Sequence, residues 1–524
     1  MTIDNTSISP KKHRDSFSSN INVDDSYHRC FQNYYHGHNY LNPNPKYITN
    51  VKSNVNHWQL RDLIKINQNS GDVFYTKSYS IWKLGLKTNS FSDSKSLMSK
   101  EILKPDYSPR CFDITNDNKM VIGGLMTSAY KIFYSNIEGL SVNNQKILRP
   151  QKGLFTFCNN DLNVYKTVKI GEMINNSVSV YNTNDTNMYK SYVCNNDSSL
   201  YCIDILNNDK LSIHNKIICE HDVSLNNVAK NPVNEKNLIV TGDSPSIFLI
   251  DPTMKNSKIN TIKTNNDSGF GISFHPNGHL FSTSFQNGHC LVYDLRSVSQ
   301  PLKEIKSTRP GHQSGAFRCC KFSNNSFSDL LVVSEHVGRV HLIDLRNLND
   351  DNHQVIIFPF ALDQFGDYKS KKIIEDSEND LKSNKSYHHN LDIYEDESKI
   401  KFNAPLVYDF DYLTNVNPKL FKYYTYQPTK QHIDIPSNPS SPSVPLLSSF
   451  QDTYNMPLDF DGSTTDSYNS DSYQHSDNHI YGEMELSGLD WYDNKLVIGC
   501  ENGGLFSWDV NYIARRSFGS FSFV

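Results

Sequence analysis

Residues 315–346 read GAFRCCKFSNNSFSDLLVVSEHVGRVHLIDLR, and this stretch decides the fold. An apolar run is followed by a polar turn, a second apolar run, a glycine-containing turn and a third run that ends in aspartate. Short apolar runs separated by tight turns predict three antiparallel strands. The stretch therefore predicts a small sheet, which cannot bury both of its faces by itself.

The same pattern recurs along the chain. It is clear in residues 224–252, 269–296 and 484–510, and weaker in 57–86, 110–136 and 170–206. Endings of the predicted third strands are spaced by 47, 43 and 50 residues in the middle of the chain, which matches a propeller blade of roughly 40–50 residues. We therefore predict an all-β fold, a seven-bladed WD40-type β-propeller, and another all-β sandwich is the alternative. The predicted third strands end near Trp82, Tyr134, Asp204, Asp251, Asp294, Asp344 and Asp509.

One interval is too long for a single blade, because 165 residues separate Asp344 from Asp509. Residues 347–480 contain 21 acidic and 10 basic residues and are rich in Ser, Asn and Pro. Such a composition cannot bury enough apolar surface to offset the entropy lost on ordering. We predict that residues 347–482 form a long, mostly disordered acidic insertion before the last blade. Two apolar pieces in it, Val355–Leu362 and Pro405–Leu413, are expected to pack, the first as the closing strand of blade six.

The remaining boundaries follow from this division. Residues 46–346 are predicted to form blades one to six, and residues 483–510 the last blade. Residues 1–45 are polar and rich in Asn and Ser, and are predicted to be disordered. Residues 511–524 form a C-terminal tail with alternating aromatic residues.

Composition excludes several classes of partner and compartment. The net charge of -5 and the pI of about 6.4 do not favour binding to a nucleic acid. Ten scattered cysteines without metal spacing predict small buried side chains in a reducing compartment, either cytoplasmic or nuclear. The N-terminus has no apolar core typical of a signal peptide, and no apolar run reaches the roughly 18 residues of a membrane span.

The sequence offers no convincing catalytic, metal or cofactor site. The histidine groups His36–His38 and His388–His389 lack Cys or acidic partners at ligand spacing. Phosphate-binding and nucleophile-elbow motifs are absent. The aspartates that end third strands recur from blade to blade, so we expect them to close turns. Phe317–Cys320 (FRCC) lacks the second Arg and the Gly of the Phe-Arg-Arg-Gly motif of phosphoinositide-binding propellers. We predict a protein that is not an enzyme and binds no cofactor.

Two segments allow more than one interpretation. Residues 58–64 (WQLRDLI) are expected to form a first-blade strand or a short helix that plugs the propeller, rather than a partner-binding element. The tail after Asp509 is either the fourth strand of the last blade or a free segment that inserts its aromatic side chains into a partner. The N-terminal segment often supplies that fourth strand in propellers, which would free the tail.

Three blocks carry a family resemblance: HWQLRDLI at 57–64, VIGGL at 121–125 and RCCKFSNNSFSDLLVVSEHVGRVHLIDLRN at 318–347. Together they resemble a fungal family of divergent WD-repeat proteins that includes the threonine N-degron substrate receptor of the GID (CTLH-type) ubiquitin ligase. The resemblance covers most of residues 50–350 and 484–510. It implies recruitment of protein substrates to a ligase scaffold through a C-terminal aromatic anchor, which in this chain is Arg515, Arg516, Phe518, Phe521, Phe523 and Val524.

The substrate site follows from the expected fold, because propellers bind ligands at one mouth of the central channel. An N-terminal amine needs a carboxylate partner, for which Asp243, Glu335 and Glu501 are the candidates. The alternative function is a general interaction scaffold with no role in degron recognition. The loops expected at the mouth contain Asn195, Asn196, Asp243, Phe285, Gln286, Glu335, His336, Glu501 and Asn502.

Overall fold

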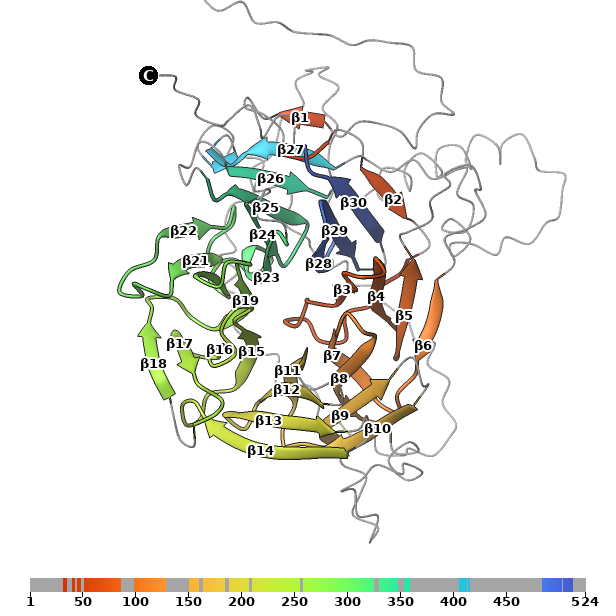
Figure 1. Ribbon diagram of the computed structural model, residues 1–524. Coiled ribbons are helices and arrows are strands. Elements are labelled where there is room, and N and C mark those ends of the chain that lie inside the picture. Colours follow the sequence, from red (N-terminus) through yellow and green to blue (C-terminus); the bar gives the residue numbers. More distant parts are fainter. Residues whose placement is uncertain are drawn as a thin grey trace, which may run out of the picture.

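The computed structural model consists almost entirely of strands, which form seven separate sheets (Figure 1). None of the described residues belongs to a helix long and apolar enough to cross a membrane. The structure describes residues 32–34, 40–42, 45–48, 51–85, 99–128, 150–159, 164–183, 188–206, 210–254, 258–324, 329–346, 353–358, 405–411, 413–414, 483–501 and 503–511.

The first four sheets each contain four antiparallel strands in chain order. The first comprises β3 (Ile64–Ile66), β4 (Asp72–Lys77), β5 (Ser80–Gly85) and β6 (Lys100–Leu103). The second comprises β7 (Ser108–Ile114), β8 (Lys119–Met126), β9 (Gln151–Asn159) and β10 (Val164–Lys169). The third comprises β11 (Asn175–Asn182), β12 (Met188–Asn195), β13 (Ser199–Leu206) and β14 (Lys210–Ile218). The fourth comprises β15 (Leu225–Lys230), β16 (Leu238–Gly242), β17 (Ser246–Ile250) and β18 (Lys258–Lys263).

The last three sheets complete a ring around a central axis (Figure 1). The fifth comprises β19 (Gly269–Phe274), β20 (Leu280–Phe285), β21 (His289–Asp294) and β22 (Lys303–Lys306). The sixth begins with β23 (Phe317–Phe322), β24 (Leu330–Glu335), β25 (Arg339–Asp344) and β26 (His353–Ile357). The seventh contains β28 (Leu486–Tyr492), β29 (Lys495–Cys500) and β30 (Gly504–Asp509). Seven radial sheets confirm the predicted seven-bladed β-propeller.

The N-terminal segment closes the ring. Strand β2 (Lys46–Ile48) pairs antiparallel with β30 and supplies the fourth strand of the seventh sheet. Tyr47 stacks on Phe506 with ring centroids 4.5 Å apart, and its hydroxyl donates to the carbonyl oxygen of Gly503 at 2.5 Å. The seventh sheet therefore joins an early and a late segment of the chain, and its fourth-strand position is occupied without the C-terminal tail. Residues 512–524 lie outside the described part of the chain.

The sixth sheet is wider than predicted. Strand β27 (Leu406–Asp409) pairs with β26, and β1 (Gln32–Tyr34) pairs parallel with β27, which gives six strands. The described residues of the two apolar pieces of the insertion therefore pack as expected. The boundary of blade six at residue 346 is too early, however. The prediction of disorder for residues 1–45 is wrong for β1 and for the buried Tyr40 and Leu41. Most of residues 347–482 lie outside the described residues.

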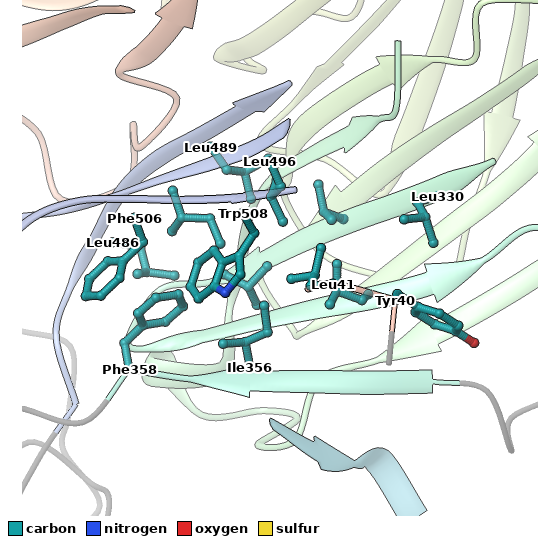
Figure 2. Close-up of a cluster of buried hydrophobic side chains, with 14 of the residues drawn as sticks. Tyr40, Leu41, Leu330, Ile356, Phe358, Leu486, Leu489, Leu496, Phe506 and Trp508 are labelled. Atoms are coloured by element: carbon teal, nitrogen blue, oxygen red, sulfur yellow. The ribbon is translucent and has the colours of Figure 1, made fainter. Parts of the chain in front are cut away.

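Apolar side chains fill the spaces between neighbouring sheets. The largest cluster lies between the sixth and seventh sheets, where Phe358 packs edge-on against Trp508 with centroids 5.9 Å apart (Figure 2). Trp508 belongs to the one Trp-Asp pair of the sequence, and it is almost completely buried. The burial of both faces of each sheet explains why the repeat needs its neighbours. Figure 2 labels Tyr40, Leu41, Leu330, Ile356, Phe358, Leu486, Leu489, Leu496, Phe506 and Trp508 in this cluster.

Three of the five aspartates predicted to end third strands close turns, whereas Asp204 lies inside β13 near His214 and Asp509 pairs with Lys495. The carboxylates of Asp251, Asp294 and Asp344 each accept a hydrogen bond from the backbone N–H two residues later, at 2.9, 2.9 and 3.0 Å. This is the usual geometry of an Asx turn. All nine cysteines in the described residues are buried thiols outside disulfides, which agrees with their predicted role as small apolar side chains.

One third strand was predicted in the wrong place. Residues after Met126 were expected to form it and to end near Tyr134, but the third strand of the second sheet is β9. Tyr134 lies in residues 129–149, which are outside the described part of the chain. The second sheet therefore holds a long insertion between its second and third strands.

Candidate functional site

Six of the seven sheets carry a β-bulge at the same place, near the start of the first strand. In each, one extra residue interrupts the pairing of the first strand with the second. A bulge re-aims the side chain of the extra residue, and bulges occur often beside binding sites. All but the last of these residues line a cavity of about 250 Å³ on the propeller axis, which we name the channel cavity. The extra residues are Arg110, Asn176, Asn226, Phe270, Arg318 and Ser487.

A loop that precedes the first sheet enters this channel. Residues 59–63 line the channel cavity together with residues from sheets two to six. Arg61 fixes the loop: its Nε donates to the Trp58 carbonyl oxygen at 2.8 Å, and its Nη1 donates to the Leu486 carbonyl oxygen at 3.0 Å. The prediction of a strand or short helix over residues 58–64 is wrong for residues 58–63, because β3 begins only at Ile64. The segment does, however, occupy the channel as expected for a plug.

A second cavity, of about 290 Å³, opens beside this loop, and we name it the mouth cavity. It shares Arg61 and Arg110 with the channel cavity, so the two adjoin. Its wall is formed by the loop before β3, by the segment before β28 and by the turn after β29. The lining residues are Val55, Asn56, His57, Trp58, Arg61, Arg110, Glu485 and Glu501.

Two partly exposed carboxylates dominate the chemistry of the mouth cavity. Arg61 Nη2 lies 2.6 Å from Glu485 and Arg61 Nη1 lies 3.5 Å from Glu501, so one guanidinium serves both acids. Burial raises the pKa of Glu501, the charge of Arg61 opposes this, and the neighbouring Glu485 raises it further, to about 7. The pair therefore holds more negative charge than Arg61 neutralises, and it favours an additional proton or cation.

Positive charge gathers on the other side of the same loop. Arg318 stacks its guanidinium on Trp58 and on Phe270, at 5.2 and 4.7 Å from the ring centroids. Burial lowers the pKa of His57 to about 4, and the nearby charges of Arg110, Arg318 and Arg61 lower it too. His57 is therefore neutral at physiological pH. The site thus has an acidic pair at its mouth and a cationic group in the channel.

The predicted substrate-binding residues fall into two groups. Four of them are structural. Phe285 is fully buried in a core cluster, and Asn195 is buried and donates to the carbonyl oxygens of Ile170 and Met173. Asn196 accepts a hydrogen bond from Asn176, and Glu335 is fully buried against arginine. These four side chains make contacts within the protein that hold the loops in place.

The other predicted residues lie closer to the site. Gln286 and His336 contact Arg318, with Nη1 of the arginine 2.6 Å from Gln286 Oε1 and its Nε 3.2 Å from His336 Nδ1. Asp243 is exposed and accepts from Asn226 at 2.8 Å. Glu501 lines the mouth cavity, and its role in substrate binding stays a prediction. Asn502 and the tail residues Arg515, Arg516, Phe518, Phe521, Phe523 and Val524 lie outside the described residues.

Several important residues were not predicted. Glu485 precedes a first strand, a loop position that was expected at the mouth, so its location was a usable signal. Arg110 and Arg318 could not be recognised, because the bulges that direct them depend on strand register. No group of three or more His, Cys, Asp or Glu side chains among the described residues is arranged to hold a metal ion. The histidines His36, His38, His388 and His389 lie outside the described residues.

Comparison with known proteins yields relatives without a described function. The family described as "Uncharacterised protein domain (DUF2415)" matches residues 315–357, which span β23 to β26 of the sixth sheet. The uncharacterized protein YLR149C of Saccharomyces cerevisiae is 29% identical over 415 residues, which cover 61% of this chain and 56% of the yeast protein. The uncharacterized protein C4G3.03 of Schizosaccharomyces pombe is 23% identical over 313 residues, covering 56% of this chain and 75% of that protein.

The match to the budding-yeast relative thus spans little more than half of that protein's length. Among solved structures, a chain of the "Crystal Structure of Mitotic Checkpoint Complex" matches with a TM-score of 0.42 and 9% identity. That match covers 58% of this chain and 82% of the other. A similarity this low carries no information about function.

Proposed function

We propose that this chain is the substrate-recognition subunit of a multisubunit ubiquitin ligase of the GID (CTLH) type and binds protein N-termini at the propeller mouth. The observation that carries the binding part is the pair Glu485 and Glu501 in the mouth cavity. The ligase and the preference for N-terminal threonine come from the family resemblance. The propeller serves as a binding platform, and the ubiquitin chemistry belongs to other subunits.

The carboxylate pair matches the chemistry of a free amine. An ammonium group has three N–H donors and one positive charge, and two adjacent carboxylates can accept those donors. Because the pKa of Glu501 is raised to about 7, an ammonium group would take the place of a shared proton. Trp58 lies at the same cavity and offers an aromatic face to the first side chain of the peptide. Amine binding should therefore release a proton near neutral pH.

The amine contact is tested with a peptide that begins with threonine and its N-acetylated form. Titration calorimetry with the full-length protein should show binding of the free amine that is weakened about tenfold or more by acetylation. The double change Glu485→Gln and Glu501→Gln should abolish this preference. Asp243→Asn, which alters an exposed acid of the fourth sheet, should not. Equal binding of the two peptides to the natural protein would refute the amine site.

Docking to the ligase is assigned to the C-terminal tail. Strand β2 already pairs with β30, so the seventh sheet has its fourth strand without residues 512–524. Deletion of residues 515–524 should abolish co-purification with the ligase subunits and change the melting temperature by no more than about 1 °C. Substitution of Phe518, Phe521 and Phe523 by Ser should have the same effect. A deletion that lowers the melting temperature strongly would show instead that the tail is part of the fold.

A further inference from the structure

Arg318 is an unusual arginine in this protein. Its side chain is almost completely buried, with the residue 2% exposed, yet no carboxylate of the described residues forms an ion pair with it. Nη1 donates to Gln286 at 2.6 Å and Nε to His336 at 3.2 Å. Nη2 has no hydrogen-bond acceptor in the described part of the protein, and the side chain lines the channel cavity.

Two other buried arginines near the sixth sheet, in contrast, have their charge balanced by carboxylates at ion-pair distance. Arg309 lies 2.6 Å from Glu335 and 3.2 Å from Glu483, and Arg339 lies 2.7 Å from Glu483. The surrounding carboxylates raise the pKa of Arg309 despite its burial. At Arg318, by contrast, burial and the nearby Arg61 lower the pKa to about 9. A buried guanidinium without a carboxylate at ion-pair distance is costly, so we infer that its partner is not among the described residues.

The surroundings of Arg318 provide more positive charge than negative charge. Arg61, Arg110, Lys65 and Lys321 also line the channel cavity, and Asp62 is its principal acid. That carboxylate is already shared by the two lysines, at 2.5 Å from Lys65 and 3.0 Å from Lys321.

The second acid of the cavity, Asp113, has its pKa raised by burial, which weakens its role as a counter-charge. Asp267 attracts the charge of Arg318 but does not form an ion pair with it, and its effect does not offset burial and Arg61, because the pKa of Arg318 stays lowered.

We propose that the channel cavity binds a compact oxyanion, a carboxylate or a phosphate, on the Nη2 edge of Arg318, with Arg110 supplying further positive charge. Trp58 and Phe270 hold the plane of the Arg318 guanidinium, so one of its edges is oriented for a planar acceptor. Because the channel cavity adjoins the mouth cavity, the anion enters from the mouth. This proposal does not rest on the proposed function, although Trp58, Arg61 and Arg110 lie beside both sites.

The test uses the full-length protein with inorganic phosphate and with acetate, each compared with chloride at the same ionic strength. The melting temperature should rise with the concentration of one or both anions until it levels off. The anion with the larger effect shows whether the site prefers a phosphate or a carboxylate. Arg318→Gln should abolish this rise. It should also raise the melting temperature in chloride, because it removes an uncompensated buried charge, so loss of binding cannot be mistaken for misfolding.

Two further variants make the result specific. Arg318→Lys keeps the charge but lacks the planar fork, so it should bind the anion about tenfold more weakly than arginine. Arg296→Gln removes a guanidinium whose side chain is 70% exposed and should respond like the natural protein. The proposal is overturned if the natural protein responds to phosphate and acetate as it does to chloride, or if Arg318→Gln responds equally. No peptide is used, so this outcome does not affect the amine test.

Discussion

At the scale of single residues, two glutamates in neighbouring sheets, Glu335 and Glu501, play opposite roles. Glu335 was predicted to bind the substrate, but its carboxylate accepts hydrogen bonds from within the protein. The donors are Thr308 N at 2.7 Å, Arg309 Nη2 at 2.6 Å and His341 Nε2 at 2.9 Å. Burial alone would raise the pKa of Glu335, but Arg309 and His341 hold it well below its usual range. Glu335 is therefore a structural ion in the sixth sheet.

Glu335→Gln should lower the free energy of unfolding by about 3–5 kcal/mol, because it leaves the buried Arg309 without its closest counter-charge. A depressed folded-state pKa means that Glu335 stabilises the protein above its unfolded pKa, near 4.5, and that this contribution is lost as the pH falls below it. Urea unfolding at pH 7 and pH 4 measures both effects. A variant as stable as the natural protein at pH 7 would contradict the structural role.

Glu501 should behave in the opposite way. Its pKa is raised to about 7 in the folded protein, so the folded state binds the proton more tightly than the unfolded chain. The stability that the protonated group contributes is lost as the pH rises from about 4.5 to about 7. Glu501→Gln should therefore stabilise the protein more at pH 8 than at pH 5, as urea unfolding at the two pH values would show. An equal effect at both would contradict the raised pKa.

At the scale of elements, closure of the ring depends on a strand of three residues, β2. Tyr47→Ala removes the stacking on Phe506 and the hydrogen bond to Gly503, and it should cost about 2 kcal/mol of stability. Tyr79→Ala changes a tyrosine that is 55% exposed and should cost no more than about 0.5 kcal/mol. Thermal unfolding of the two variants provides the comparison. Similar losses would mean that β2 contributes little to closure.

Most strands could be predicted from local pattern, and the exceptions have a physical cause. Third strands ending near Asp204, Asp294, Asp344 and Asp509 were found because apolar runs, tight turns and a terminal aspartate coincide there. The third strand of the second sheet was misplaced, because the apolar residues that follow Met126 have the β-propensity of a strand. Local propensity contains no information about which distant segment pairs with β8. The same limit concealed β1, whose pairing partner β27 lies far along the chain.

At the scale of the whole molecule, the propeller itself defines the site. The repeat pattern predicted the number of sheets. The propeller rule predicted Glu501 as a substrate-binding residue, and in the structure Glu501 lines the mouth cavity. The ring of bulge residues could not be predicted, because it exists only when the first strands of different sheets converge on one axis. Arg318 illustrates this: the sequence shows an apolar strand with one arginine, and only the assembled ring surrounds it with Trp58, Phe270 and Arg61.

A crystal structure of the full-length protein with a bound peptide that begins with threonine tests the central claim most directly. We predict that the peptide nitrogen lies within hydrogen-bond distance, about 3 Å, of the Glu485 and Glu501 carboxylates, with its first side chain against Trp58. A peptide bound with its amine in solvent, or on the outer strands of the blades, would contradict the account.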